Sequence, residues 1–363
     1  MVTDAAAGLL PYRVLVGAGA LGTLGALVTG IDANRWVVIA DQTVATHHAA
    51  PVLAQLARVS TRPALLLTVP PGEAEKTRER WATLTDAMLA AGCGRDTAVL
   101  ALGGGVVGDL AGFVAATYMR GLPVVQVPTT LLAMVDASVG GKVAVDTPAG
   151  KNLVGAFHPP ALVVIDPATL TTLPAADLRA GAVEALKHGV IASPAHFADA
   201  ADLLTRVARG DCHVAADFVA ASVAIKARVV ADDPRERGRR HVLNFGHTVG
   251  HAVELLSGYA LRHGEAVAIG MVVEATAAEL GGIARTGTAA RIRDALAGGG
   301  LPVAPPAAIT ADAVLDAARL DKKARRGAIQ YALPTEIGTM AEGDGRWTLP
   351  LPDALVREAL HAA

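Results

Sequence analysis

The chain has 363 residues, of which 52% are hydrophobic, and its 34 acidic side chains nearly balance its 32 basic ones. This size indicates a globular protein of about two domains, and the balanced charge gives no reason to expect nucleic acid or a membrane surface as a partner. The two cysteines, Cys93 and Cys212, lie far apart and the N-terminus lacks a signal-peptide pattern, so we expect a cytoplasmic protein without a CxxC zinc or redox site.

The first half of the chain alternates short apolar strands with helices. Strands are predicted at 12–16, 36–40, 64–69, 97–102, 124–127 and 162–165, with an Ala/Leu/Gly-rich helix after the first strand and a second helix at 75–91. The most apolar run, 98–116, contains several glycines and Asp109, which indicates buried structure and not a membrane span. This pattern predicts a Rossmann-like α/β domain with a mostly parallel sheet that is covered on both faces.

After Pro174 the pattern becomes mostly helical. Helices are predicted at 175–190, 197–209, 212–231, 248–256, 265–280 and 289–297, and the next strand at 329–333. We therefore place a domain boundary near residues 173–177. The expected domains are an α/β domain at 1–174 and a mostly α-helical domain at 175–363.

Two glycine-rich loops follow predicted strands. Residues 17–22 form a literal GxGxxG, and Asp41 comes about 20 residues later, as in a dinucleotide fingerprint. The second loop, residues 102–109, contains Gly103, Gly104 and Gly105 in succession, which would let backbone N–H groups approach a pyrophosphate at the start of a helix. Either loop could instead be a tight strand-to-helix turn without a ligand. The first loop fits this alternative better than the second, which is richer in glycine.

Polar residues are concentrated at 127–152. The segment sets Thr129, Thr130, Asp136, Lys142, Lys151 and Asn152 among small and apolar residues. Further cations stand in Gly-, Asn- or His-containing stretches, namely Lys187, Lys226, Arg240 and Lys322. A lysine in apolar surroundings is costly unless it is paired with an anion, so this set suggests a phosphorylated or carboxylated substrate. Taken singly, each of these lysines could instead be an exposed loop residue.

Candidate metal ligands lie in the second half. His247 and His251 are four residues apart and share a helical face, and Asn244 would lie one turn earlier on nearly the same face. His263 follows within 17 residues, and Glu184 shares a face with Lys187 and His188. A carboxylate with two histidines is a common catalytic zinc set. The alternatives are core or capping histidines and a surface ion pair between Glu184 and Lys187.

Several segments together resemble 3-dehydroquinate synthase, from about residue 12 to residue 334. They are PGEAEKT at 71–77, GRDTAVLALGGGVVGDLAGF at 94–113, VPTTLLAMVDASVGGK at 127–142, GKNLVGAFHPP at 150–160, the Glu-x-x-Lys of 184–187, NFGHTVGHA at 244–252, HGEAVAIGM at 263–271 and DKK at 321–323. The combination makes the resemblance specific.

The resemblance implies an enzyme of the shikimate pathway. Members of this family convert 3-deoxy-D-arabino-heptulosonate 7-phosphate to 3-dehydroquinate and phosphate, by transient oxidation with NAD, phosphate elimination, re-reduction and aldol closure. They use NAD and one divalent metal, usually zinc, with cobalt as the other candidate. The α/β domain would bind NAD, the helical domain would bind metal and substrate, and the protein would be a homodimer.

Carried over by motif, the metal ligands would be Glu184, His247 and His263, which leaves His251 as a catalytic or substrate-contacting group. The NAD contacts would be Asp41, Glu73, Lys76, Gly104, Gly105, Val106, Asp109, Thr129, Thr130, Lys142, Lys151, Thr172 and Leu173. The catalytic and substrate contacts would be Asp136, Lys142, Asn152, Lys187, Lys226, Arg240, Asn244, His251, Lys322 and, from a neighbouring subunit, Arg120. The resemblance thus favours the second glycine loop for the pyrophosphate.

Two positions depart from the family pattern. Asp146 stands where asparagine is frequent, and His188 where tyrosine or threonine is more usual.

Three other classes of protein are alternatives to this family. Sister sugar phosphate cyclases accept sedoheptulose 7-phosphate, glucose 6-phosphate or an aminated substrate; Arg240 and Asn244 argue against the first two substrates. A metal-dependent polyol dehydrogenase would release NADH and would not need so many cations. A non-catalytic relative would be expected to lack some of the assigned residues.

Overall fold

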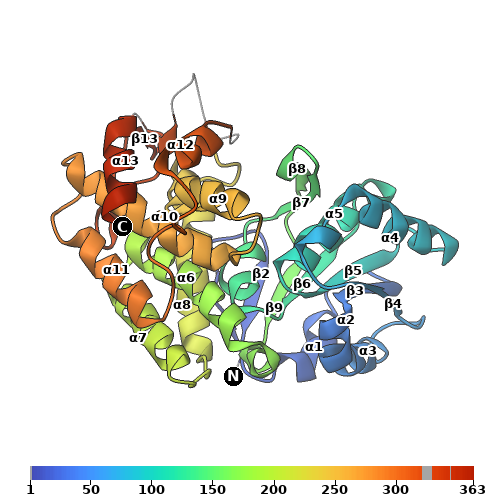
Figure 1. Ribbon diagram of the computed structural model, residues 1–363. Helices are drawn as coiled ribbons and strands as arrows, with labels where there is room; N and C mark the ends of the chain where they lie inside the picture. Colours follow the sequence, from blue (N-terminus) through green and yellow to red (C-terminus); the bar gives the residue numbers. More distant parts are fainter. Residues whose placement is uncertain (1, 321–328, 344) are drawn as a thin grey trace. The chain divides into compact units, whose positions relative to one another are not determined.

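The computed structural model describes residues 2–320, 329–343 and 345–363 (Figure 1). The chain forms two compact units, the first made of Met1–Leu173 with Val214–Arg228 and the second of Pro174–His213 with Val229–Ala363. The sequence-based division at residue 174 differs from these units at one segment, because 214–228 lies with the first unit. This segment is the larger part of α8 (Ala216–Asp232).

A seven-stranded sheet forms the centre of the first unit. Its order is β1 (Thr3–Asp4), β2 (Arg13–Val16), β9 (Leu162–Ile165), β6 (Val124–Pro128), β5 (Thr97–Gly103), β3 (Arg35–Asp41) and β4 (Leu65–Val69). All neighbouring pairs are parallel except β1 with β2. The predicted mostly parallel sheet is therefore confirmed.

Alternate residues of each central strand face opposite sides, so two apolar cores form. On one side, α1 (Leu24–Leu27) and α3 (Ala50–Leu56) pack on the face that contains Trp36 and Leu100. On the other side, α4 (Arg78–Ala90) and α5 (Gly105–Thr117) pack on the face that contains Val37 and Val99. Strands that are buried on both faces explain the continuous apolar runs of the sequence.

Two predicted helices of this unit are shorter than expected. The Ala/Leu/Gly-rich segment forms only a 3-10 turn, η1 (Ala20–Thr23), and the four-residue α1. The helix predicted at 75–91 begins at Arg78, because Thr77 caps it by accepting the N–H of Arg80 at 3.1 Å. A 3-10 turn, η3 (Glu73–Glu75), precedes it.

The order of the strands marks one point of the sheet for ligand binding. From β3 the chain crosses one face through α2 (Gln42–Val44), η2 (Ala45–Ala49) and α3 to β4, whereas from β5 it crosses the opposite face through α5 to β6. Because β3 and β5 are neighbours whose connections leave in opposite directions, their carboxyl ends form the topological switch point, where open α/β sheets bind ligands. Asp41 ends β3, and Gly103 ends β5.

A hairpin that the sequence did not predict completes the first unit. Strands β7 (Lys142–Thr147) and β8 (Gly150–Phe157) pair antiparallel outside the main sheet. Large apolar side chains of β8 are exposed, including Phe157 at 51% and Leu153 at 46%.

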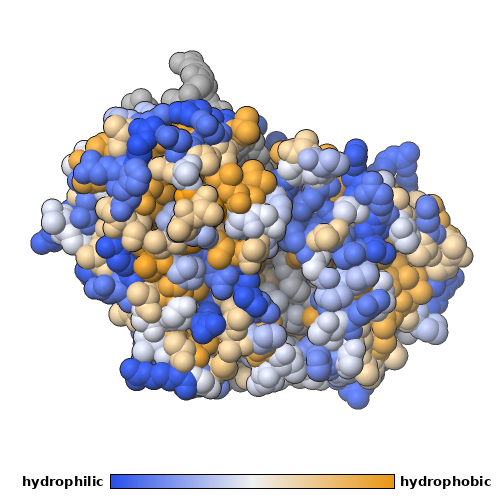
Figure 2. All heavy atoms as spheres, viewed as in Figure 1, coloured by the Kyte–Doolittle hydropathy of each residue, from blue (hydrophilic) through white to orange (hydrophobic). Residues whose placement is uncertain are grey.

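On the face of the molecule shown in Figure 2, hydrophobic side chains are interspersed with hydrophilic ones.

The second unit is mostly helical, as predicted. Its helices are α6 (Ala175–Ala192), α7 (Pro194–Ala208), α9 (His247–Leu256), α10 (His263–Leu280), α11 (Thr288–Gly298), α12 (Ala311–Leu320) and α13 (Asp353–Ala362). Two small antiparallel pairs accompany them, β10 (Gln330–Tyr331) with β13 (Leu349–Pro350) and β11 (Pro334–Glu336) with β12 (Thr339–Met340). No helix among the described residues has the length and apolar character to cross a membrane.

Glycines of α10 bring three helices together. A Cβ on Gly264 would lie 2.3 Å from the carbonyl oxygen of Ala180 in α6, and a Cβ on Gly270 would lie 1.9 Å from the carbonyl oxygen of Gly246 just before α9. Any larger residue would push these backbones apart. Close packing on α10 therefore sets the positions of the first turn of α9 and of the middle of α6.

Candidate active site

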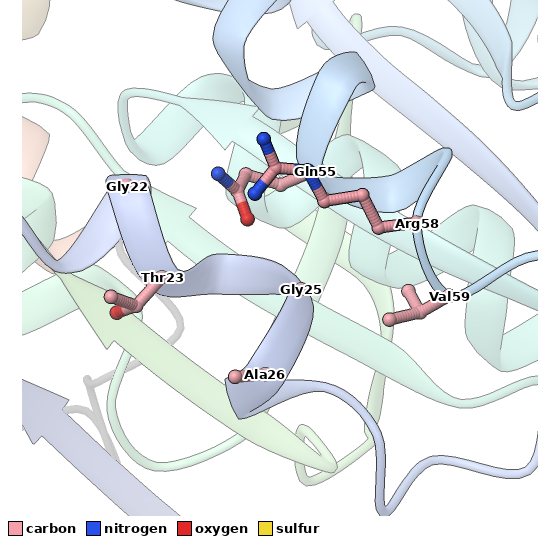
Figure 3. A pocket seen from close by; sticks show the side chains of 7 residues that line it. All are labelled: Gly22, Thr23, Gly25, Ala26, Gln55, Arg58 and Val59. Carbon is pink, nitrogen blue, oxygen red and sulfur yellow. The ribbon is translucent and has the colours of Figure 1, made fainter.

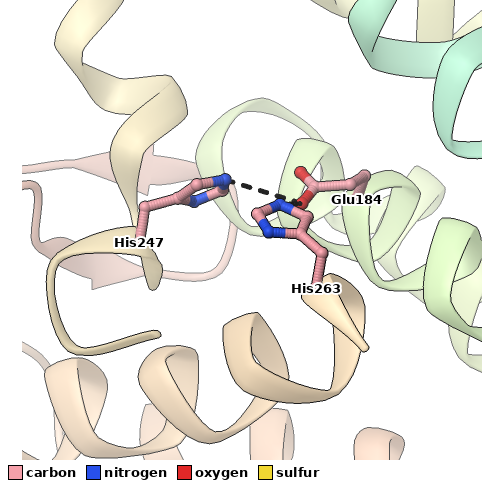
Figure 4. A group of neighbouring side chains, drawn as sticks. All are labelled: Glu184, His247 and His263. Carbon is pink, nitrogen blue, oxygen red and sulfur yellow. Dashed lines mark ion pairs between the residues drawn. The ribbon is translucent and has the colours of Figure 1, made fainter. Parts of the chain in front are cut away.

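Three potential metal ligands converge in the second unit (Figure 4). Glu184 lies in α6, His247 is the first residue of α9, and His263 is the first residue of α10. The Nε2 atoms of His247 and His263 lie 3.6 Å and 3.5 Å from Oε1 of Glu184. One ligand atom from each residue lies within 4.8 Å of the other two.

Each imidazole is oriented by its second nitrogen. Nδ1 of His247 is 3.1 Å from the carbonyl oxygen of Phe245, and Nδ1 of His263 is 3.3 Å from Oε2 of Glu254. Since both partners are acceptors, the network assigns the proton to Nδ1 in each ring. Both Nε2 atoms are then directed toward Glu184. The sequence did not reveal the role of Glu254.

The charges around Glu184 keep it ionised. Burial alone would raise its pKa, but the Lys187 ammonium and the two imidazoles hold the pKa of Glu184 well below its ordinary value. Burial and the charge of Lys187 lower the pKa of His247 well below its ordinary value. Although burial disfavours its charged form, the neighbouring carboxylates of Glu184 and Glu254 raise the pKa of His263 to about 9.

The ion pair between Glu184 and Lys187 exists, but it is not on the surface. The two side chains are 0% and 1% exposed. Beyond this ion pair, neither oxygen of Glu184 has a hydrogen-bond partner among the described residues. An ionised buried carboxylate beside two imidazole nitrogens fits a divalent metal such as zinc, with positions left for substrate oxygens.

His251 lies beside this group but is not part of it. It stands one turn after His247 in α9, and its ring centroid is 5.3 Å from that of His247 and 5.9 Å from that of His263. A ligand atom of His251 falls instead within 4.8 Å of His263 and Glu254. This position places His251 next to the candidate metal group.

The predicted helical face of Asn244 is wrong. Asn244 ends a separate 3-10 helix, η7 (Arg239–Asn244). Gly246, at a φ of 78°, interrupts the helical conformation before α9. The side chain of Asn244 lies 3.4 Å from Oε1 of Glu236. Arg240, 2% exposed, donates to the carbonyl oxygen of Pro234 at 2.8 Å.

A carboxylate that the sequence analysis missed shapes this loop. Oδ2 of Asp233 accepts the N–H groups of Gly238 at 2.7 Å and Arg240 at 3.1 Å, and Oδ1 accepts that of Arg237 at 2.9 Å. These bonds fix the backbone that carries Arg240 and Glu236. These bonds are local, since the partners are four to seven residues apart, so an Asp followed by a Gly-containing loop was the available signal.

In the first unit, the second glycine loop presents a helix N-terminus. Helix α5 begins at Gly105, and its N-cap, Gly104, provides no side-chain cap. A Cβ on Gly104 would lie 3.1 Å from Cγ2 of Thr130, and one on Gly105 would lie 3.3 Å from Cβ of Ala137. The N–H of Thr129 bonds to the carbonyl oxygen of Gly103 at 2.9 Å. The loop therefore fits a phosphate that approaches the backbone closely.

The first glycine loop binds an anion of the protein itself. The N–H groups of Gly19 and Leu21 donate to the two carboxylate oxygens of Asp166, at 2.9 Å and 3.1 Å. Amides that would contact a pyrophosphate in a dinucleotide fingerprint are thus already paired. Asp41, at the end of β3, caps α2 by accepting the N–H of Val44 at 2.9 Å.

A cavity of about 380 Å³ lies beside the first loop (Figure 3). It is lined by Gly22, Thr23, Gly25, Ala26, Gln55, Arg58 and Val59. Gly22 closes the first glycine loop, and none of these residues is among the site residues that the family resemblance implies. The cavity contains one charged side chain, that of Arg58, and no acid–base pair, so its lining offers no catalytic chemistry.

A cluster of acidic side chains surrounds Lys76, which is buried at 4% exposure. Its Nζ lies 3.2 Å from Glu73, 3.3 Å from Asp109 and 3.7 Å from Asp146, and it donates to Oδ1 of Asn152 at 2.8 Å. The structure thus brings together four residues that the sequence analysis had assigned to NAD or substrate. Asp146, noted only as a departure, links the hairpin to this cluster, because its N–H donates to the carbonyl oxygen of Lys76 at 2.6 Å. Within the hairpin, its carboxylate accepts the N–H of Asn152 at 2.8 Å.

We expect Asp109 to give the protein a pH-dependent stability. Burial raises the pKa of Asp109 from 3.8 to about 6, despite the opposing charge of Lys76. Between these pH values the folded state binds more protons than the unfolded state, so the free energy of unfolding must fall as pH rises. The change corresponds to about 3 kcal/mol, at 1.36 kcal/mol per unit of pKa.

Urea unfolding of the wild type and of Asp109→Asn at pH 4.5, 5.5 and 7 measures this contribution. The wild type should lose stability relative to the variant as pH rises. Equal pH dependence of the two proteins would contradict the raised pKa. The comparison with the variant removes the contributions of titrating groups that lie outside the Lys76 cluster.

The remaining predicted residues are distributed as follows. In the first unit, Lys226 of α8 forms an ion pair with Asp136 at 2.6 Å, and Oγ1 of Thr172 bonds with Nε2 of His48 at 3.1 Å. Lys151 lies 3.6 Å from Glu73. Further residues of this unit are Lys142 at the start of β7, Val106 in the first turn of α5, Leu173 after η6 (Pro167–Thr172), and Arg120, exposed at a φ of 70°. Lys322 lies outside the described residues.

Solved structures show which class of protein has this fold. The chain superposes on 2-deoxy-scyllo-inosose synthase complexed with carbaglucose-6-phosphate, NAD+ and Co2+, with a TM-score of 0.87 and 25% identity over 97% of each chain. It superposes on 2-epi-5-epi-valiolone synthase from Streptomyces hygroscopicus subsp. jinggangensis with NAD+ and Zn2+ bound, with a TM-score of 0.86 and 30% identity over 97% of this chain and 96% of that one. The fold is that of the sugar phosphate cyclases.

Sequence comparison identifies the family within this class. Residues 66–180 match the model of the 3-dehydroquinate synthase N-terminal domain, and residues 181–324 match that of the C-terminal domain. The 3-dehydroquinate synthase of Symbiobacterium thermophilum is 46% identical over 90% of this chain and 92% of its own. That of Xanthomonas axonopodis pv. citri is 44% identical over 91% of both. The chain belongs to the 3-dehydroquinate synthase family.

Proposed function

We propose that the protein converts 3-deoxy-D-arabino-heptulosonate 7-phosphate to 3-dehydroquinate and phosphate, with NAD and one divalent metal, zinc or cobalt, as cofactors. Membership of the 3-dehydroquinate synthase family supports the reaction. The observation that carries the proposal is the convergence of Glu184, His247 and His263, with both Nε2 atoms directed at one buried carboxylate.

Glu184, His247 and His263 would hold the metal. A divalent metal supplies a Lewis acid that makes a substrate hydroxyl more acidic. Lys187, whose ammonium pairs with Glu184, adds positive charge beside the reacting oxygens. His251, on the same face of α9 as His247, is placed to exchange a proton with a substrate hydroxyl.

NAD would lie at the carboxyl ends of β3 and β5. The uncapped start of α5 at Gly104 and Gly105 suits the pyrophosphate, and Asp41 suits a ribose. Thr129, which follows β6, reaches the same edge of the sheet. The other proposed contacts are Glu73, Lys76, Val106, Asp109, Thr130, Lys142, Lys151, Thr172 and Leu173.

Two anionic groups of the substrate require cations. Arg240 with Asn244 would bind the carboxylate, since a guanidinium matches its geometry. Lys142, Asn152 and Lys322 would hold the phosphate, together with Arg120 from a second subunit of a homodimer. Lys226 and Asp136, which pair with each other, complete the proposed substrate contacts. The exposed apolar side chains of β8 are consistent with a surface that a second copy covers.

One assay tests the proposed reaction. Purified protein is incubated with NAD, zinc and the seven-carbon acid phosphate, and phosphate release is followed together with NADH absorbance. Because the hydride that NAD takes up is returned in the same turnover, we expect stoichiometric phosphate and 3-dehydroquinate without net NADH.

Other outcomes would identify a different function. The same fold occurs in sister cyclases, and phosphate release with another cyclic product would move the protein to that group. The fold also occurs in a glycerol dehydrogenase from Schizosaccharomyces pombe, with a TM-score of 0.62 and 20% identity. Accumulation of NADH with simple polyols and no phosphate release would overturn the proposed reaction in favour of a dehydrogenase.

A further inference from the structure

We propose that Glu254 and Glu274 are positioning residues that form a reciprocal clamp: each extends from one of the helices α9 and α10 and fixes the metal-binding start of the other. This inference rests on the proposed metal site. It concerns side chains that do not themselves belong to the group of Glu184, His247 and His263.

Glu254 fixes the ring of His263. It follows His247 and His251 in α9 at a spacing of four and then three residues, which keeps all three side chains on one helical face. Its carboxylate is 5% exposed and lies 3.3 Å from Nδ1 of His263. A buried carboxylate that accepts the Nδ1–H group determines both the tautomer and the rotation of the imidazole. Nε2 of His263 is thereby held toward Glu184.

Glu274 fixes the backbone on either side of His247. It is 1% exposed, and its two oxygens accept the N–H of Gly246 at 2.7 Å and the N–H of Val249 at 3.0 Å. The first N–H groups of a helix have no partner within the helix, and its N-terminus favours a negative charge. Anchoring at two amides prevents the first turn of α9 from rotating, and so it sets the direction of the His247 side chain.

The two contacts are reciprocal in the sequence as well as in space. His263 begins α10, and Glu274 follows it 11 residues later, about three turns along the same face. His247 begins α9, and Glu254 follows it two turns later. Each helix therefore supplies one ligand and the support for the ligand of the other. We infer that this arrangement preorganises both Nε2 atoms before a metal binds.

Glu254→Gln tests the first half of the clamp. Metal-free protein is titrated with Zn2+ against a chromophoric chelator, and Co2+ is added to the same protein to record its visible absorption bands. We expect the affinity for zinc to fall by about 10- to 100-fold, the usual effect of losing such an outer partner, and the Co2+ bands to change. Glu254→Asp keeps the charge and should recover part of the affinity. It also serves if the glutamine variant does not fold.

Glu274→Gln tests the second half, with Glu279→Gln as the matched control. Glu279 also lies in α10 and accepts an N–H group at the start of another helix, that of Ala289 in α11 at 2.6 Å. Both variants should lower the thermal midpoint of the metal-free protein. Only Glu274→Gln should also weaken zinc binding and alter the Co2+ bands.

The outcomes separate this inference from the proposed metal site. If the wild type binds neither Zn2+ nor Co2+, the metal site and the function proposed from it fail. If the wild type binds both ions, and the variants at Glu254 and Glu274 match it in affinity and spectrum, the clamp is overturned while the metal site stands. An equal loss of affinity in Glu279→Gln would also overturn the clamp, since general destabilisation would then explain the effect.

Discussion

Replacing His263 with alanine is expected to abolish retention of the divalent metal and to lower the rate of phosphate release by at least about 1,000-fold. The variant keeps only Glu184 and His247 of the converging group. Loss of a metal that acts as a Lewis acid removes several kcal/mol of transition-state stabilisation, and about 4 kcal/mol corresponds to a factor of about 1,000. Metal content after dialysis and the initial rate of phosphate release measure the two effects.

His361→Ala provides the control for this experiment. His361 is an exposed histidine in the last turn of α13, in the same unit of the protein. It should retain both metal and activity. Since Lys187 still pairs with Glu184 in His263→Ala, that variant should fold, which its thermal midpoint can verify. A stoichiometric metal content in His263→Ala would disprove the ligand assignment.

The sequence predicted the elements of the fold better than it predicted their neighbours in space. Apolar runs at β3 and β5 identified the buried parallel strands, because strands covered on both faces have no polar side. The segment after β2 was mistaken for a full helix on its composition. Its amides instead bond to Asp166, about 145 residues away, and no local pattern reveals such a partner.

The same limit applies to the site. Histidine spacing indicated a metal group, but it did not distinguish His247 from His251, because both share one helical face. The tertiary position of Glu184 in α6 separates them, because only His247 groups with Glu184 and His263. Gly246 was the overlooked local signal: a left-handed residue directly before His247 ends any helix that Asn244 could share.

The signal in the sequence was weakest for the partners of buried charged residues. Glu274 accepts amide hydrogens from residues 25 and 28 positions earlier, and in the sequence it is one glutamate in an apolar helix. Lys76, in the turn before α4, has acidic partners in that turn, in α5 and in β7, and the β7 partner is near because the hairpin lies beside the turn. These contacts depend on the packing of distant segments, which periodicity does not encode.

Valine at Gly104 is expected to weaken NAD binding far more than valine at Gly19. Gly104 has a φ of −76°, which any residue adopts, but a Cβ there would lie 3.1 Å from Cγ2 of Thr130 at the start of α5. The side chain would obstruct the approach of a pyrophosphate to the helix N-terminus. Loss of two hydrogen bonds to a charged group, each about 1.5 kcal/mol, corresponds to about a 100-fold higher Kd.

At Gly19 there is space for a side chain, but the backbone conformation is unfavourable for one. A Cβ there meets nothing within 4 Å, but its φ of 80° is strained for any other residue. Gly19→Val should therefore lower the thermal midpoint, at a cost of about 1–3 kcal/mol for a strained backbone, and leave the Kd for NAD unchanged. Calorimetric titration with NAD and thermal unfolding of both variants measure the two effects separately. The reverse order of Kd values would return the pyrophosphate to residues 17–22, and Asp166 would then have to release the amides of that loop.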